Sequence, residues 1–151
     1  MDKIILPLFK AIAGDDQDSV RLLAIQAASD LGENLSLEQL NEHIMPVILL
    51  LSRDTSWRVR FMVAAHLVKI ALPFNSDSNR VELLDIFVNL LRDSEPEVRA
   101  AAALIIADFG KLLKESQIIH SICPPALVLV NDTSQHVRGE CSLTHTLSPM
   151  Y

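Results

Sequence analysis

Apolar residues recur along the chain with the three- and four-residue spacing of a helix face, and the pattern returns after every 39 residues. In the first stretch one apolar stripe runs through Ile5, Phe9 and Ile12, and a second begins at Val20 and continues through Ala24. Each period therefore predicts two amphipathic helices joined by a short turn. The predicted helix pairs are 2–14 with 17–31, 37–52 with 56–72, 79–92 with 96–112, and 116–130 with 134–144.

A short motif, Asp-x-x-x-x-Val-Arg, marks the same point of every period. It starts at Asp15, Asp54, Asp93 and Asp132, so that each occurrence follows the previous one by 39 residues. Self-similarity at such a period predicts an all-α solenoid, in which antiparallel helix pairs stack side by side. We expect one array over residues 1–151, with about four units at 1–35, 36–75, 76–114 and 115–151, the last of them incomplete.

Residues that start, bend or end helices recur at the joints of the pattern. Asp and Ser residues in the turns within pairs, such as those after Gly14, are expected to cap the second helix. Ser36 with Gln39 fits a capping box, and Gly32 and Gly110 stand where second helices should end. Prolines share one column of the first helices and predict bends there. These prolines are Pro7, Pro46 and Pro124, and the third unit has Asp85 in that column.

The recurring aspartates and arginines predict a structural ladder. Equal spacing lets the arginine of one unit reach the aspartate, or the turn carbonyls, of the neighbouring unit. We expect this use to outweigh any direct part in binding. Besides Asp15, the ladder residues are Asp54, Asp93, Asp132, Arg21, Arg60, Arg99 and Arg138.

Composition narrows the class of protein. The chain is 50% hydrophobic, but its longest apolar stretches, Ile44–Leu51 and Ile122–Val130, are far shorter than the ~20 residues of a membrane helix. A net charge of −6 with no basic stripe argues against nucleic-acid binding. The first residues lack the features of a signal peptide, so we expect a cytoplasmic location, with the nucleus as a further one. Cys123 and Cys141 fall on apolar faces and are expected to be reduced packing residues.

Catalytic and metal-binding patterns are missing from the sequence. It contains no Gly-rich phosphate loop, no G-x-S-x-G and no H-E-x-x-H, and we expect neither enzymatic activity nor a cofactor. Among the five histidines, His66 aligns with Ala27 and Ile105, which favours a partly buried packing role over a ligand or a base.

The most informative departures from the period are Trp57 and Arg58. Trp57 aligns with Asp18, Pro96 and Gln135, which are turn residues, so this column should face solvent. Tryptophan and arginine are the residues most enriched in interface hot spots. The alternative is that the tryptophan ring folds back on its own helix and only covers apolar surface.

The motif and its turns resemble HEAT repeats. The turn sequences that begin at Asp15, Ser56, Glu97 and Asn131 follow one another in an order similar to that of internal repeats of the scaffold (A) subunit of protein phosphatase 2A. The resemblance covers residues 3 to about 138 and implies a non-catalytic scaffold that binds a regulatory (B-type) subunit through the turns within its repeats. Residues implied to contact it are Trp57, Arg58, Asp15, Asp16, Gln17, Asp18, Glu95, Pro96, Glu97, Ser134, Gln135 and His136.

Two further functions remain open from the sequence. A nuclear-transport receptor of the karyopherin type shares the architecture, and fold alone does not determine function. Some HEAT-repeat proteins resemble di-iron hydroxylases, but those carry repeated His-Glu dipeptides, which this chain lacks. A catalytic subunit is expected as a partner only if the array continues beyond this chain.

The last part of the chain departs from the repeat. Gly139 weakens the final helix and His145 occupies an apolar column, so we expect a short or frayed helix and an irregular stretch over 145–151. Uncapped apolar faces at the ends of the array should favour self-association or a continuation of the repeats.

Overall fold

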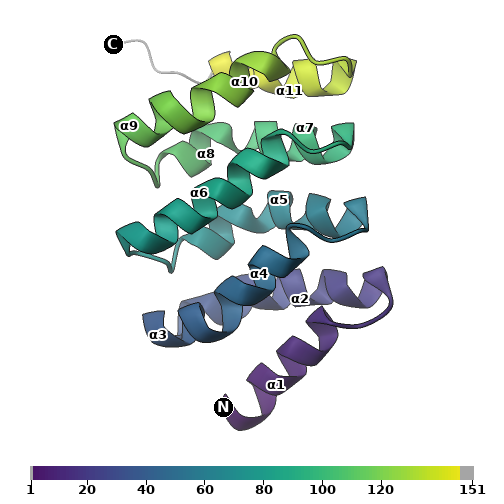
Figure 1. Cartoon of the computed structure of the whole chain (residues 1–151), viewed down its shortest axis with the longest axis vertical. Coiled ribbons are helices and arrows are strands. Elements are labelled where there is room, and N and C mark those ends of the chain that lie inside the picture. The colour runs from purple at the N-terminus through teal and green to yellow at the C-terminus, as the bar shows by residue number, and fades with distance from the viewer. Residues whose placement is uncertain (1, 147–151) are drawn as a thin grey trace. The chain divides into compact units, whose positions relative to one another are not determined.

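The computed structural model describes residues 2–146, with side chains for residues 4–141. These residues form helices joined by short turns, and no strand occurs among them (Figure 1). The fold is an all-α solenoid of helix hairpins, as the period predicts. The described residues divide into two compact units between Ser76 and Asp77, each with two hairpins. The single continuous array over 1–151 stays a prediction.

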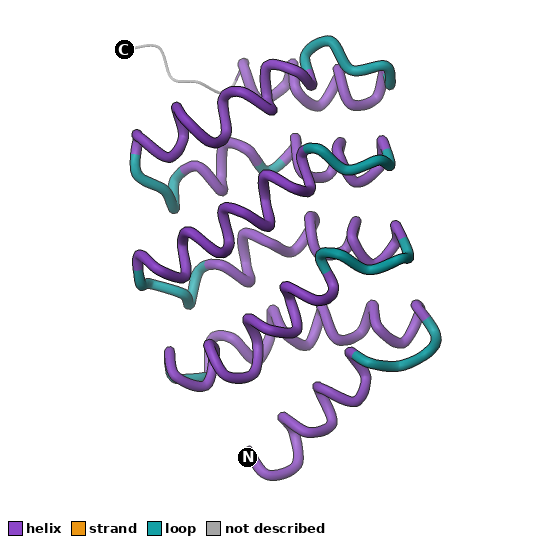
Figure 2. The backbone as a smooth tube through the Cα atoms, viewed as in Figure 1, coloured by secondary structure: helices purple, strands orange, loops and turns teal. Residues whose placement is uncertain are grey.

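The first unit contains one hairpin of α1 and α2 and a second hairpin whose first helix is built in three pieces. The turns within the two hairpins lie at one edge of this unit, and the turn between the hairpins lies at the opposite edge (Figure 2). The elements are α1 (Asp2–Ala13), α2 (Asp18–Leu31), a 3₁₀ turn (Gly32–Asn34), α3 (Leu37–Gln39), a π-helical turn (Leu40–Ile44), α4 (Met45–Leu51) and α5 (Trp57–Ala71).

The second unit repeats this plan with different interruptions. Its elements are α6 (Asp77–Leu91), α7 (Pro96–Leu104), α8 (Ile106–Gly110), α9 (Glu115–Gln117), a π-helical turn (Ile118–Ile122), α10 (Cys123–Leu129) and α11 (Gln135–Thr146). The observed boundaries agree with the predicted helix pairs to within a few residues. Gly32 directly follows α2 and Gly110 ends α8, as predicted, and Ser36 and Gln39 form the predicted capping box.

Two of the first helices change their hydrogen-bonding pattern just before a proline. In the second hairpin the Met45 N–H donates to the Leu40 carbonyl, five residues back, and Pro46 follows at the start of α4. The π turn accommodates a proline that has no N–H to give to an α-helical bond. Asp85 replaces the proline in α6, which is uninterrupted. Pro7 lies inside α1, which continues across it.

The second helix of the third hairpin is interrupted, which corrects the prediction of one helix over 96–112. The Ile105 N–H donates to the Ala102 carbonyl, three residues back, and the Ile105 backbone leaves helical geometry (φ −97°, ψ 4°). This shorter bond separates α7 from α8. No glycine or proline marks the position, so local sequence carries no signal for the interruption.

The turn aspartates do not cap the second helices, contrary to the prediction. The residues at the N-cap positions of α2, α5 and α7 make no capping bond through their side chains. Instead, the carboxylate of each turn aspartate accepts the N–H of the residue two positions later. The pairs are Asp15 with Gln17 (2.9 Å), Asp54 with Ser56 (2.8 Å), Asp93 with Glu95 (3.0 Å) and Asp132 with Ser134 (2.9 Å). The aspartates therefore fix the turn that leads into each helix.

The apolar stripes meet inside each unit. In the second unit the rings of Phe87 and Phe109 pack with their centroids 4.4 Å apart, joining α6 to α8. In the first unit Phe9, Ile25 and Leu67 are fully buried. Removing a side chain of this size from water stabilises the fold by about 1.5–3 kcal/mol, so these contacts hold the hairpins together.

Three expectations near the end of the chain need correction. Cys141 is buried, but Cys123 is exposed, although the residues in its column of the earlier hairpins are buried. The last helix is not short, because α11 continues to Thr146 and includes Gly139. Positions 145 and 146 are therefore helical, and the remainder of the expected irregular stretch lies outside the described residues.

Candidate protein-binding site

Each turn within a hairpin is held by the arginine of the repeated motif. The Nη1 atom of Arg21 donates to the carbonyls of Asp15 (2.8 Å) and Asp16 (3.1 Å), which lie six and five residues earlier. Arg60, Arg99 and Arg138 make the same pair of bonds to their own turns. The prediction that these arginines reach the carbonyls of a neighbouring unit is wrong, because the turn preceding the same helix is closer.

The other guanidinium nitrogens join one hairpin to the next inside each unit. Arg21 donates through Nε and Nη2 to the two carboxylate oxygens of Asp54, at 2.7 and 2.9 Å. Arg99 and Asp132 repeat this two-point contact in the second unit, at 2.8 and 2.9 Å. Two parallel charge-assisted bonds set both distance and orientation. The ladder thus fixes the position of consecutive turns within a unit.

The ladder aspartates are held in the ionised form. Partial burial opposes ionisation of Asp54, but bonds from Arg21 and from the Ser56 N–H outweigh it and keep the pKa of Asp54 below its ordinary value. For Asp132 the hydrogen bond from Arg99 is the largest influence and lowers its pKa in the same way. The turns are therefore fixed by charged contacts at neutral pH.

Trp57 and Arg58 begin α5 at the turn edge of the first unit. The Arg58 guanidinium lies over the Trp57 ring, 5.4 Å from its centroid, which is within the range of a cation–π contact. Trp57 also meets Phe61, one helical turn later, edge to face with centroids 6.5 Å apart. Trp57 is 37% exposed and the Arg58 side chain 64%, so the cluster has an apolar base and a charged, accessible tip.

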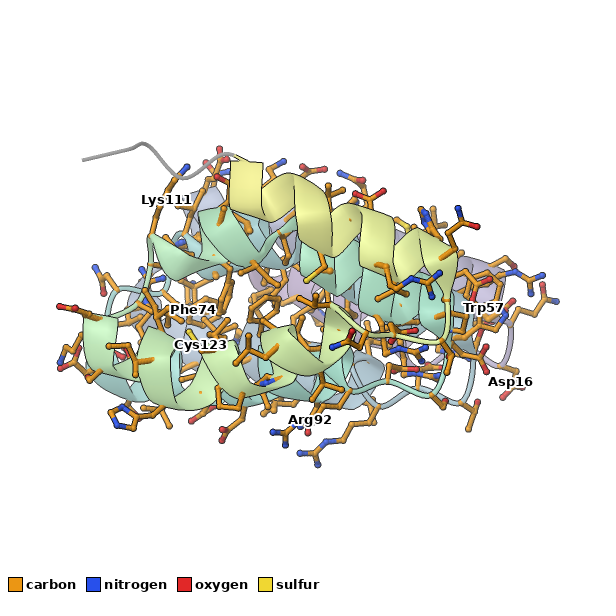
Figure 3. All side chains as sticks on the ribbon, turned by 90° about the horizontal axis from the view of Figure 1, so that it is seen from above. Asp16, Trp57, Phe74, Arg92, Lys111 and Cys123 are labelled. Atoms are coloured by element: carbon orange, nitrogen blue, oxygen red, sulfur yellow. The ribbon has the colours of Figure 1, made fainter. Side chains whose placement is uncertain are left out.

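A contact from the preceding hairpin supports this cluster. The Ser56 hydroxyl donates to the Asp18 carboxylate at 2.8 Å, and Arg58 Nη1 lies 3.8 Å from the same carboxylate oxygen. Figure 3 shows Trp57 and Asp16 at the same end of the molecule. Asp16 and Gln17 are exposed, and Asp15 and Asp18 are half-buried. The two turns of the first unit therefore form one surface, which we call the Trp57 surface: Asp15, Asp16, Gln17, Asp18, Ser56, Trp57, Arg58 and Phe61.

The candidate residues of the second unit form a more polar surface. Glu97 lies in the first turn of α7, and Pro96 occupies its first position, where the missing N–H costs nothing. His136 Nδ1 lies 3.9 Å from the Glu140 carboxylate, one turn further along α11. Exposed or half-buried at these turns are Glu95, Pro96, Glu97, Ser134, Gln135 and His136.

Sequence reasoning missed Phe61 and Ser56. Phe61 aligns with Leu22 and Ala100, so its column is typical of ordinary helix packing. Its place four residues after Trp57 is a usable signal, because residues at that spacing are neighbours on a helix. The bond from Ser56 to Asp18 joins residues 38 positions apart, and no local pattern indicates it.

His66 lies between charged neighbours on the helix surface away from the turns. It is partly buried, as predicted, and burial lowers its pKa, so the ring is neutral at pH 7. Asp30 accepts hydrogen bonds from Lys69 at 2.8 Å and from Gln26, and these lower its pKa. Over the part of the chain that the structure describes, no group of His, Cys, Asp and Glu could hold a metal ion. Within the same part, every helix is too short or too polar to cross a bilayer.

Comparisons with known proteins place this hairpin solenoid in a class. Residues 44–72 match the family model described as HEAT repeat, and residues 76–143 match the one described as PPP2R1A-like HEAT repeat. The crystal structure of Cex1p superposes on 93% of this chain and 27% of its own, with a TM-score of 0.81 and 20% identity. That likeness shows the fold alone. The chain is a HEAT-repeat protein.

Sequence relatives define the family more narrowly. A Caenorhabditis elegans protein named "Probable serine/threonine-protein phosphatase PP2A regulatory subunit" is 38% identical over 135 residues, which is 89% of this chain and 22% of that protein. The Dictyostelium discoideum protein phosphatase 2A scaffold subunit is 43% identical over 120 residues, 80% of this chain and 20% of its own. The regulatory A subunit of the Schizosaccharomyces pombe protein phosphatase PP2A is 40% identical over 67 residues, 44% and 11% of the two chains. The chain belongs to the HEAT-repeat proteins that resemble the A subunit of protein phosphatase 2A, and it spans 11% to 22% of the length of these three relatives.

Proposed function

We propose that this chain is a non-catalytic scaffold segment that binds a regulatory subunit of a PP2A-type phosphatase through its intra-hairpin turns. The relatives that carry the names of scaffold and regulatory subunits support the scaffold role. The single observation that carries the binding site is the Trp57 surface. It combines an accessible tryptophan and an accessible arginine on turns that the ladder holds in place.

The Trp57 surface has the physical character of an interface anchor. A large ring that is partly exposed in the free protein gains apolar burial when a partner covers it. The ring is already oriented by Phe61 on one side and Arg58 on the other, so little side-chain entropy is lost on binding. Anchors of this kind contribute about 2 kcal/mol or more at protein interfaces. We therefore assign Trp57 the central role and Arg58 an orienting and charge-pairing role.

The remaining candidate residues extend this proposal along the turns. Asp16, Gln17 and Asp18 lie beside Trp57 within the first unit and would contact the same partner. Glu95 to Glu97 and Ser134 to His136 present further polar groups on the second unit. Because polar groups at the rim of an interface contribute little energy, these residues would set specificity and association rate rather than affinity.

The test is binding of purified regulatory subunits to immobilised chain with and without Trp57→Ala. We expect affinity to fall by about thirtyfold or more, which corresponds to about 2 kcal/mol. The matched control is Leu72→Ala, since Leu72 is an exposed apolar residue at the other end of α5. If the Trp57 variant is folded and binds as well as the control, the assignment of the site is wrong.

Several related expectations belong to the same proposal. A catalytic subunit would bind only through repeats beyond this segment, and we place the protein in the cytoplasm and also in the nucleus. The karyopherin-type alternative makes a different prediction in the same experiment. Binding of a small nuclear GTPase or of transport signals, with no binding of phosphatase subunits, would favour that alternative.

A further inference from the structure

The outer face of the first hairpin is an open apolar groove between α1 and α2. The groove has a volume of about 270 Å³. It is lined by Ile5, Leu8, Phe9, Ile12, Ala27, Asp30 and Leu31. One carboxylate among apolar side chains is the composition of a packing face rather than of a small-molecule site.

Equivalent residues of the second hairpin show what kind of object fills such a face. Leu8 is 62% exposed, whereas Val47, its equivalent 39 residues later, is 7% exposed. Ile5 is also exposed, and its equivalent Ile44 is fully buried. In the second hairpin the same columns are covered by the first hairpin, because α4 contacts both α1 and α2. The groove therefore has the shape that receives another helix hairpin of this repeat.

A charged contact is prepared next to the groove. Asp15 accepts the Gln17 N–H through its carboxylate, and its carbonyl accepts Arg21 Nη1, as in the equivalent turns of Asp54 and Asp132. The carboxylates of those two aspartates each accept two bonds from an arginine of the preceding hairpin. Among residues 4–141, no arginine hydrogen-bonds the Asp15 carboxylate. Asp15 thus offers an unused site of the ladder for a guanidinium.

The last hairpin exposes the complementary face. Val130 is 39% exposed, whereas Ala13, which occupies the same column, is buried beneath the hairpin that follows it. Cys123 is exposed in a column where Leu6 and Met45 are buried. Arg138 follows Val137 as in every other unit and is held by its own turn carbonyls at 2.6 and 3.3 Å. Its guanidinium therefore has the same anchorage as those that form the ladder.

We propose that the first hairpin of one copy of this chain packs against the last hairpin of a second copy, head to tail, with Arg138 of one copy bonded to Asp15 of the other. Charge complementarity favours a second copy as the occupant, because the chain itself supplies an arginine and an aspartate at the two required positions. The hairpins share one period, so the apolar columns come into register when that contact forms. Such an association is heterologous and continues into longer assemblies as concentration rises.

Sedimentation velocity of the purified chain tests this arrangement, from about 1 µM to about 200 µM, where associations of low affinity become populated. We expect the average mass to increase with concentration and the increase to weaken with salt, since a charged contact contributes. The variants D15R and R138D each place like charges at the junction and should weaken association about tenfold or more. An equimolar mixture of the two restores opposite charges at every junction and should associate like the wild type.

Two variants control for effects on folding and on net charge. D16R makes the same charge change one residue away, where only the carbonyl takes part in the turn, and should associate like the wild type. D15N keeps an acceptor for the Gln17 N–H but removes the charge, and should weaken association without unfolding the turn. A monomer at all concentrations would overturn the proposal. Association that D15R leaves unchanged, or that the mixture fails to restore, would overturn it as well.

Discussion

The contact between Arg99 and Asp132 offers a direct test of what the ladder contributes to stability. Arg99→Met keeps the apolar stem of the side chain and removes the guanidinium. It eliminates two bonds to the Asp132 carboxylate, at 2.8 and 2.9 Å, and two bonds to the carbonyls of Asp93 and Ser94, at 2.8 and 3.0 Å. The Asp132 side chain is only 7% exposed, so its charge would remain largely out of water without a cationic partner.

The expected loss follows from that geometry. Removing one partner of a buried ion pair costs about 3–5 kcal/mol, and the turn lies at the edge of the unit, so we take about 3 kcal/mol. Asp132→Asn retains an acceptor for the Ser134 N–H and should cost about 1–2 kcal/mol. The double variant should lose less than the sum of the two, with a coupling energy of about 1–2 kcal/mol.

Urea unfolding followed by far-ultraviolet circular dichroism measures these losses. With a slope of about 2 kcal/mol per molar urea, the midpoint of the Arg99→Met variant should fall by about 1.5 M. Amide exchange at Ser134 gives a local measure and should become faster. Arg92→Met serves as the control, because Arg92 is an exposed arginine in the same unit. If the Arg99 and Arg92 variants differ by less than about 0.5 kcal/mol, the ladder does not stabilise the hairpins as we argue.

Further predictions concern pH and glycine. The pKa values of Asp54 and Asp132 are depressed on folding, so their stabilising effect is complete above the ordinary carboxyl pKa of about 4. It should be lost as pH falls below that value, and replacing both residues by asparagine should flatten a plot of unfolding midpoint against pH. Gly32→Ala should destabilise the fold by about 1 kcal/mol, because the new Cβ would lie 3.2 Å from Pro73 Cγ. Gly139→Ala should raise the free energy of unfolding by about 0.5–1 kcal/mol, because its Cβ meets nothing within 4 Å inside α11; thermal melts that show equal effects of the two changes would contradict this contrast.

Periodicity alone was enough to predict the helix hairpins. Apolar spacing of three and four residues specifies an amphipathic helix wherever it occurs, and the return of the motif at Asp54 and Asp132 specifies stacking. The same reasoning placed Trp57 in an exposed column, and the side chain is indeed partly exposed. The interruption at Ile105 had no such signal, because helix propensity there is favourable and the change is in backbone bonding.

By itself, therefore, the sequence determined the class of fold, the positions of the hairpins and the aspartates and arginines that recur in the turns. Only the tertiary structure decided which oxygen each donor reaches. Arg21 uses one nitrogen for its own turn and two for Asp54, and Ser56 reaches Asp18 across two hairpins. The physical reason is that a helix repeat constrains residues a few positions apart, whereas these bonds join residues 33 and 38 positions apart. Such partners meet only after the hairpins have packed, at distances that the local pattern does not contain.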